Sequence, residues 1–235
     1  MQKLSQHTAI LIFSRTAREE AHVKQFGRHL SAAQNLKIAQ LLIRRTRRMA
    51  KRTRLPVFTV SGGQQRGRTF GQRFTNAIAD VFDKGYDQVI TIGSDCPALT
   101  PQILLDAQQQ LQRGKIVTGA DHSGGIYFLG ISRQHFLRQT LANIPWQSGQ
   151  DFDSIRQYAD QLQIELAAGS MLIDVDDARD LKRVVQGGHA NCDLLKKLRQ
   201  LLQYARISVS CPVWFPQFAF PNACGLRGPP VYPVG

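Results

Sequence analysis

Apolar runs of strand length alternate along this chain with segments whose apolar residues recur at helical spacing. The runs that predict strands are Thr8–Phe13, Leu55–Val60, Val89–Ile92, Lys115–Thr118, Ile126–Ile131 and Ile164–Ala167. Continuous apolar runs of this length suit strands that are buried on both faces of a parallel sheet. Helical patterns are predicted between the strands over residues 31–54, 74–85, 100–111, 133–141 and 151–162. Two more follow the last strand, over residues 177–185 and 194–204.

This alternation predicts a three-layer α/β fold in which a doubly wound, mostly parallel sheet carries helices on both faces. The runs at 8–13, 55–60, 88–93 and 126–131 should share one sheet, and the last of them is either parallel or antiparallel to the others. Ligands of such sheets bind beyond the carboxyl ends of the strands.

The chain divides at about residue 205. Residues 1–205 are predicted to form a single α/β domain, since sheets of this class reach such lengths as one unit. Residues 206–235 contain six prolines and cannot be regular helix or sheet throughout. This segment is either a strap packed by its aromatic residues or a loose end, and its aromatic content favours the strap.

Positive charge exceeds negative charge by 13 at pH 7, which attracts anions of every kind. Seven cations fall within the eleven residues from Arg44 to Arg54. They indicate either a patch for nucleic acid or membranes, or a solvated helix face. No stacking aromatic is interleaved with them, so the solvated face is favoured and no specific nucleic-acid partner is expected.

The four cysteines form no CxxC pair and have no spacing typical of a zinc site. Free thiols in a reducing compartment are therefore expected. No apolar run approaches the roughly 20 residues of a membrane span. The N-terminal apolar run is too short for a signal core, so the sequence predicts a cytoplasmic protein without a transmembrane segment.

The segment from Gly93 to Thr100 is the most informative candidate site. Asp95 directly follows a predicted buried strand, and Gly93 would let a ligand approach the backbone closely. A carboxylate at that edge can hold Mg²⁺ or Mn²⁺, which neutralises phosphate oxygens. The alternative is that Asp95 caps the following turn, and the pattern alone leaves both hypotheses open.

Two later segments offer further candidates. The glycine-rich turn around Gly124 and Gly125 suits backbone contact with a ligand, although a simple hairpin turn explains the same pattern. Asp174 or Asp176 could complete a metal site with Asp95, whereas Asp176 or Asp177 could instead cap the next helix. Two carboxylates close together without a cation would repel and raise one pKa, so neutralising Asp95 could even raise stability without ligand.

Taken together, these segments resemble the GT-A-fold nucleotide-diphospho-sugar transferases, in particular a poorly characterised bacterial branch assigned provisionally as glycosyltransferases. The resemblance runs from about Thr8 to Val185. It is carried, in order, by Phe70-Gly-Gln-Arg-Phe74, Ile92–Thr100, Gly124-Gly-Ile-Tyr-Phe-Leu-Gly130, Pro145-Trp-Gln147 and Asp174-Val-Asp176.

The resemblance implies a nucleotide site formed by Phe13, Lys24, Gly93, Asp95, Gly124 and Gly125, and a divalent cation, Mg²⁺ or Mn²⁺, held by Asp95 and Asp176. It implies transfer of a glycosyl group from a nucleotide-diphospho-sugar to an acceptor. It assigns no catalytic residue. The donor sugar, the base, the acceptor and the oligomeric state stay open.

The chain departs from the family pattern at three places. Gln25-Phe26 stands where a Thr-Arg pair usually follows the lysine, Ser123 replaces the acid before the double glycine, and Ile126 replaces an aromatic residue. Nucleotidyl transfer is a second hypothesis, although Phe13–Glu20 lacks the glycines of a phosphate loop. A non-catalytic nucleotide-binding protein is a third.

Overall fold

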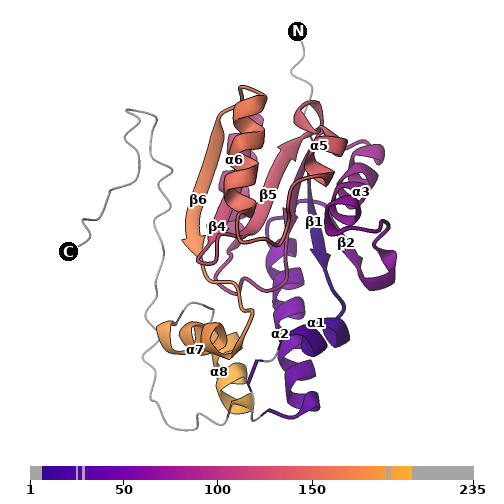
Figure 1. Ribbon diagram of the computed structural model, residues 1–235. Helices are drawn as coiled ribbons and strands as arrows, with labels where there is room; N and C mark the ends of the chain where they lie inside the picture. Colours follow the sequence, from indigo (N-terminus) through magenta and orange to yellow (C-terminus); the bar gives the residue numbers. More distant parts are fainter. Residues whose placement is uncertain (1–6, 25, 28–29, 189, 191, 203–235) are drawn as a thin grey trace, which may run out of the picture.

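Figure 1 shows the computed structural model of the chain, which describes residues 7–24, 26–27, 30–188, 190 and 192–202. Within these ranges, six strands form one sheet in the order β2-β1-β3-β5-β4-β6. The strands are β1 (Thr8–Ser14), β2 (Val57–Ser61), β3 (Gln88–Ile92), β4 (Ile116–Asp121), β5 (Ile126–Ser132) and β6 (Leu166–Leu172). The predicted tail segment, 206–235, lies outside the described residues.

The sheet is parallel except at β5. Strand β1 pairs in parallel with β2 and β3, and β4 pairs in parallel with β6, whereas β5 runs antiparallel to β3 and β4. The prediction of a mostly parallel sheet containing 126–131 is therefore confirmed. The direction left open for that strand is antiparallel.

Helices cover both faces of the sheet. Alternate side chains of β1 face opposite ways, so Leu11 packs with α3 (Phe70–Asp83), α5 (Arg138–Ala142) and α6 (Asp151–Gln161). Ile12 packs with α4 (Pro101–Gln112) and the end of α2 (Ala32–Lys51) on the other face. The fold is thus the predicted three-layer α/β arrangement.

A separate group of helices lies at the carboxyl ends of the strands, below the sheet in Figure 1. It consists of α1 (Ala17–Val23), the first part of α2, α7 (Ala178–Gly187) and α8 (Cys192–Leu201). Their apolar faces form a core of their own, centred on Phe26, Ile38, Leu181 and Leu198. We call these four helices the helical layer.

Helix α1 was not predicted, although the sequence contains a signal for it. Thr16 accepts a hydrogen bond from the backbone N–H of Glu19, and the Glu19 carboxylate accepts one in return from the backbone N–H of Thr16. This arrangement is a capping box, and the pattern Thr-x-x-Glu is its signature in a sequence. The helix delivers Glu20 and Lys24 to the edge of the sheet.

Two predicted elements differ from the structure. The last strand begins later than predicted and extends through Gly169 and Ser170, where the Tyr127 hydroxyl donates to the Ser170 carbonyl. These small residues resemble a turn in the sequence, but a Cβ at Gly169 would lie 3.2 Å from the Tyr127 hydroxyl oxygen and 3.4 Å from the Phe128 ring. The helix predicted over 133–141 is broken at Phe136, where the Tyr158 hydroxyl takes over backbone hydrogen bonds of His135 and Leu137.

The basic run lies at the end of α2 and just beyond it. Arg44, Arg47, Arg48, Lys51, Arg52 and Arg54 are exposed, and the sequence from residue 31 to residue 54 contains no acid. Arg45 is different, because its guanidinium donates to the backbone carbonyls of Cys96 and Leu99. Among the described residues, no helix is long and apolar enough to cross a membrane.

The exposed arginines are expected to bind any polyanion weakly and without sequence preference. Two unrelated DNA duplexes should bind alike at low salt, and binding should fade steeply toward physiological salt, because cation–phosphate contacts release counterions. Fluorescence anisotropy across a salt series measures this, with Arg44→Gln/Arg48→Gln as the weakened variant. Tight binding that prefers one duplex at physiological salt would contradict the prediction.

Candidate functional site

A pocket of about 340 Å³ opens at the carboxyl edge of the sheet. It lies where β1 and β3 end, which is the point at which the strand order reverses, since β2 lies on one side of β1 and β3 on the other. Pockets at such switch points are the usual ligand sites of α/β sheets. Phe13, Gly93, Asp95, Gly125 and Asp176, all predicted site residues, line it.

Lys24 is the centre of a cluster of oxygen atoms beside this pocket. Its Nζ atom lies 2.5 Å from Asp95 Oδ2 and 2.8 Å from Asp176 Oδ1. It also donates to the backbone carbonyl of Val175 at 3.1 Å, and Glu20 Oε2 lies 3.8 Å away. The lysine is 6% exposed, so its charge is neutralised mainly by these groups.

The electrostatics of Lys24 and Asp95 agree with a stable ion pair. Burial alone would lower the pKa of the ammonium, but the carboxylates of Asp95, Glu20 and Asp176 raise it well above its usual value. Burial alone would raise the pKa of Asp95, yet Lys24 holds that pKa below its usual value. The two carboxylates expected to repel each other therefore share a cation, and neutralising Asp95 should lower stability rather than raise it.

Asp174 has no such compensation. Its Oδ1 atom is buried and has no hydrogen-bond partner among the described residues. Burial, reinforced by the charges of Asp95 and Asp121, raises the pKa of Asp174 well above its usual value. Asp174 and Asp176 both line the pocket, but only Asp176 reaches Lys24 with an ion pair.

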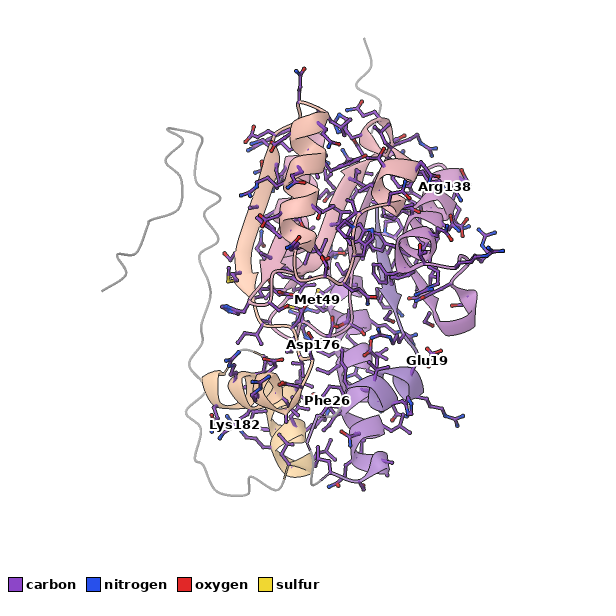
Figure 2. All side chains as sticks on the ribbon, in the orientation of Figure 1. Glu19, Phe26, Met49, Arg138, Asp176 and Lys182 are labelled. Atoms are coloured by element: carbon purple, nitrogen blue, oxygen red, sulfur yellow. The ribbon has the colours of Figure 1, made fainter. Side chains whose placement is uncertain are left out.

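The capping alternatives are settled by the hydrogen bonds. Asp177 is the N-cap of α7 and accepts from the backbone N–H groups of Arg179 and Asp180. Thr100, and not Asp95, caps α4. Asp176 caps neither helix, and both Asp95 and Asp176 form ion pairs with Lys24. Figure 2 shows Asp176 between the strand ends and the helical layer.

The turn between β4 and β5 is a hairpin turn that also faces the pocket. The Asp121 carboxylate accepts hydrogen bonds from the Ser123 backbone and hydroxyl and from the Gly125 N–H. The family pattern has its acid at the position of Ser123. In this chain the nearby carboxylate belongs to Asp121, two positions earlier. Gly124 does not line the pocket; it has φ +85°, and a Cβ there would lie 2.0 Å from the Gly149 carbonyl.

Aromatic rings form one wall of the pocket. Phe13 contacts Phe70 and Phe74 edge to face at 5.7 and 5.5 Å between ring centroids. Trp146 packs on Phe74 at 4.9 Å, and its indole N–H donates to the Leu141 carbonyl. Because the rings meet edge to face or tilted, the wall presents both ring faces and ring edges, an apolar lining typical of small-molecule pockets.

Several lining residues have no counterpart among the predicted ones. Arg15 and Arg73 line the pocket and bring positive charge to a chain that lacks the family's Thr-Arg pair. Asp151, 9% exposed, begins α6 and also lines the pocket, and burial raises its pKa. Arg73 belongs to the motif Phe70-Gly-Gln-Arg-Phe74 but was not predicted as a site residue, and Arg15 belongs to no motif named above.

The oxygen atoms around Lys24 fit a hard divalent cation. Carboxylates of Asp95 and Asp176 and the carbonyl of Val175 converge on one point, and the Lys24 ammonium stands in for a cation there. Mg²⁺ and Mn²⁺ prefer such oxygen ligands and complete their shells with water and phosphate. No group of three His, Cys, Asp or Glu side chains in the described ranges is arranged to hold a metal, so water and phosphate would have to supply the remaining ligands.

Sequence comparison supplies the family. Residues 25–148 match the model of a family described as "uncharacterized protein conserved in bacteria (DUF2064)". The chain belongs to this family. The matched segment carries Asp95, the turn at Gly124 and Gly125, and Trp146, whereas Lys24 and Asp176 lie outside it. A search of curated proteins finds no match for this DUF2064 chain.

Solved structures share the DUF2064 chain's fold. A protein from Desulfovibrio desulfuricans G20, described provisionally as a nucleotide-diphospho-sugar transferase, superposes with a TM-score of 0.73 at 19% identity, over 86% of this chain and 99% of that one. A homologue of Mycobacterium tuberculosis Rv0371c from Mycobacterium sp. strain JC1 gives a TM-score of 0.48 at 15% identity, over 84% and 100% of the two chains. The first match confirms the predicted fold class.

Proposed function

We propose that this protein transfers a glycosyl group from a nucleotide-diphospho-sugar to an acceptor with the help of Mg²⁺ or Mn²⁺. The observation that carries the proposal is the convergence of Asp95, Asp176 and the Val175 carbonyl on one cationic point at the mouth of the pocket. A cation bound there would stabilise the charge that develops on a leaving diphosphate.

The chain's own residues have distinct parts in this proposal. The carboxylates of Asp95 and Asp176 would hold the cation, and Gly93 would let the diphosphate approach the backbone. Arg15 and Arg73 line the pocket and would attract phosphate oxygens that the cation leaves uncovered. The wall formed by Phe13, Phe70, Phe74 and Trp146 would orient an aromatic base or a sugar ring.

Asp151 is the residue best placed to assist an acceptor. It lines the pocket at the start of α6, away from the Lys24 cluster, and the Ser148 backbone N–H donates to its carboxylate. Burial raises the pKa of Asp151, which makes its carboxylate a stronger base that could accept a proton from an attacking hydroxyl. The bond from the sugar to the diphosphate would break as the new glycosidic bond forms.

A ligand screen is the test of this function. Thermal unfolding should be followed with UDP-, GDP-, CMP- and dTDP-sugars, with and without Mn²⁺. One of these sugars should raise the unfolding temperature only when Mn²⁺ is present, and at a hundred times its Kd it should stabilise by about 2.7 kcal/mol. Stabilisation that is the same with EDTA would contradict a metal-assisted site.

Reaction products separate this function from nucleotidyl transfer, which the fold also allows. Glycosyl transfer releases a nucleoside diphosphate, or a monophosphate from a CMP-sugar, whereas nucleotidyl transfer to a sugar phosphate consumes a nucleoside triphosphate and releases pyrophosphate. Incubation with the best binding nucleotide sugar, followed by mass spectrometry, should show the nucleotide product without pyrophosphate. Pyrophosphate release from a triphosphate would favour the second activity.

A further inference from the structure

A lysine occupies the place that the proposed cation needs. Lys24 Nζ lies within 3.1 Å of three oxygen atoms, one from each of Asp95, Asp176 and Val175. Mg²⁺ binds oxygen at about 2.0–2.1 Å, so it needs the same oxygen atoms at still shorter range. One point in space cannot hold both the ammonium and the metal ion.

We infer that Lys24 is a resident counter-ion of the cation site, and that a divalent cation binds there only when the ammonium moves away. The inference rests on the proposed function, because it concerns the same cation. It adds that the free protein keeps its site closed to metal by means of its own side chain.

Glu20 offers the ammonium a second position. Its carboxylate is one helical turn before Lys24 on α1, and its Oε2 atom lies 3.8 Å from Lys24 Nζ. Glu20 Oε2 is buried and has no hydrogen-bond partner among the described residues; Arg15 lies 3.7 Å from it, beyond hydrogen-bonding range. A short movement of the flexible lysine side chain would exchange Asp95 and Asp176 for Glu20.

That second position faces the substrate. Glu20 and Arg15 line the pocket, whereas Lys24 in its observed position does not. An ammonium beside Glu20 could therefore contact a diphosphate bound to the metal. Phosphate oxygens would also screen the repulsion between the ammonium and the metal ion, which is strong between like charges a few ångströms apart.

The movement predicts a specific order of affinities. Metal alone has to displace the ammonium and then lie close to it, so the free protein should bind Mn²⁺ weakly. A nucleoside diphosphate attracts the ammonium and the metal together, so it should strengthen Mn²⁺ binding beyond simple chelation. By linkage, Mn²⁺ should strengthen nucleotide binding by the same factor.

Mn²⁺ binding to the metal-free protein, followed by electron paramagnetic resonance without nucleotide, tests the inference. Lys24→Met and Lys24→Gln remove the competing charge and should bind Mn²⁺ at least tenfold more tightly than the wild type. Lys115→Met is the matched control, because Lys115 pairs only with Glu165 in the described part of the chain. The two residues precede β4 and β6 and do not line the pocket, so this change should leave Mn²⁺ binding unchanged.

Glu20→Gln provides a second arm. It removes the alternative partner of the ammonium and should weaken Mn²⁺ binding at least threefold in the wild-type background. In the Lys24→Met background the same change should have no effect, because that variant has no ammonium group for Glu20 to bind. Non-additivity of this kind is the signature of two residues that act through each other.

Labelling of the wild type gives a readout that does not depend on whether the variants fold. Acetylation of Lys24 by an amine-directed reagent, measured by peptide mass spectrometry, should be slow in the metal-free protein and at least threefold faster with saturating Mn²⁺. Unchanged Lys24 labelling would overturn the inference.

The binding outcomes separate the inference from the proposed function. Equal or weaker Mn²⁺ binding in folded Lys24→Met and Lys24→Gln, with clear binding by the wild type, overturns the resident counter-ion and leaves metal-assisted transfer standing. If neither wild type nor variants bind Mn²⁺, even with every nucleoside diphosphate tested, the proposed function fails as well.

Discussion

Asp95→Asn is expected to lower the affinity for a Mn²⁺–nucleotide-sugar complex at least 100-fold, about 2.7 kcal/mol. The substitution removes the charge of the carboxylate that follows β3 and that contributes one of the oxygen atoms converging on the cationic point. An amide oxygen is a weaker ligand for a hard cation than a carboxylate is. Calorimetry with the ligand found in the screen measures the loss.

Asp176→Asn and Asp153→Asn are the comparisons for this variant. The Asp176 side chain is 58% exposed, so water can replace its oxygen, and the loss should be smaller than for Asp95→Asn. Asp153 lies on the exposed side of α6 and should have no effect. Equal affinity in wild type and Asp95→Asn would remove the metal site from the proposed function and favour a non-catalytic nucleotide-binding protein.

Stability in EDTA should also fall in Asp95→Asn. Lys24 loses its nearest partner while it stays buried, and loss of a charged hydrogen bond costs about 1.5–3 kcal/mol. Asp176 and Glu20 remain close to the ammonium and limit the cost. Urea unfolding at neutral pH measures it, and an increase in stability would show that carboxylate repulsion dominates despite Lys24.

Asp174→Asn is expected to have the opposite effect and raise the free energy of unfolding by about 1–3 kcal/mol at neutral pH in EDTA. The amide removes only the cost of the buried charge, and each unit by which a carboxyl pKa is raised on folding costs about 1.4 kcal/mol at a pH above that pKa. The Asp174 Oδ1 atom is buried without a hydrogen-bond partner among the described residues, with the like charges of Asp95 and Asp121 nearby. The amide has nearly the same shape and no charge to bury.

The sign of the pH dependence follows from the raised pKa of Asp174. Below the pKa of the unfolded carboxyl, about 3.9, both states are protonated and Asp174 carries no penalty. As the pH rises from there to the folded pKa, the unfolded chain ionises more readily, so the wild type loses stability relative to Asp174→Asn. The advantage of the variant should therefore be larger at pH 7.5 than at pH 5.

Thermal unfolding of both proteins at pH 5 and pH 7.5 checks this difference. Asp153→Asn is again the control, since its carboxylate is exposed and pairs with Arg156 at the surface. An advantage of Asp174→Asn that is constant across this range, or a lower stability at both pH values, would contradict the account of a strained buried carboxyl.

Much of the fold could be predicted because burial on both sides of a sheet leaves a direct mark on the sequence. Strands β1 and β3 are continuous apolar runs, and the alternation of helices and strands indicates that they share one largely parallel sheet. Strand β6 could not be placed correctly, since Gly169 interrupts the apolar pattern where β6 packs against the Tyr127 hydroxyl and the Phe128 ring. The need for a small residue at this place comes from side chains of β5, so it cannot be recognised in the sequence of β6 alone.

The candidate site was predictable only in part for a similar reason. Asp95 could be found because it directly follows a buried strand, and Asp176 because it precedes a helix. Lys24 was placed by family resemblance as a nucleotide ligand, but its contact with Asp95 joins residues 71 apart in the sequence. Asp121 was not predicted, because it is held at the pocket by hydrogen bonds from Ser123 and Gly125 in a local turn that the motif does not encode.

The bonds of Val175 have a consequence for the order in which the protein is made. Its N–H donates to the Asp95 carbonyl, and its carbonyl accepts from Lys24, a residue 151 positions earlier. The ribosome therefore has to synthesise β6 and the segment after it before Lys24 can contact Val175 and Asp176. Contacts between residues so far apart in the sequence form slowly, because closing a long loop costs conformational entropy before the contacts stabilise it. The nascent chain can build β1–β3 early, but the oxygen cluster around Lys24 can form only after Asp176 has been synthesised.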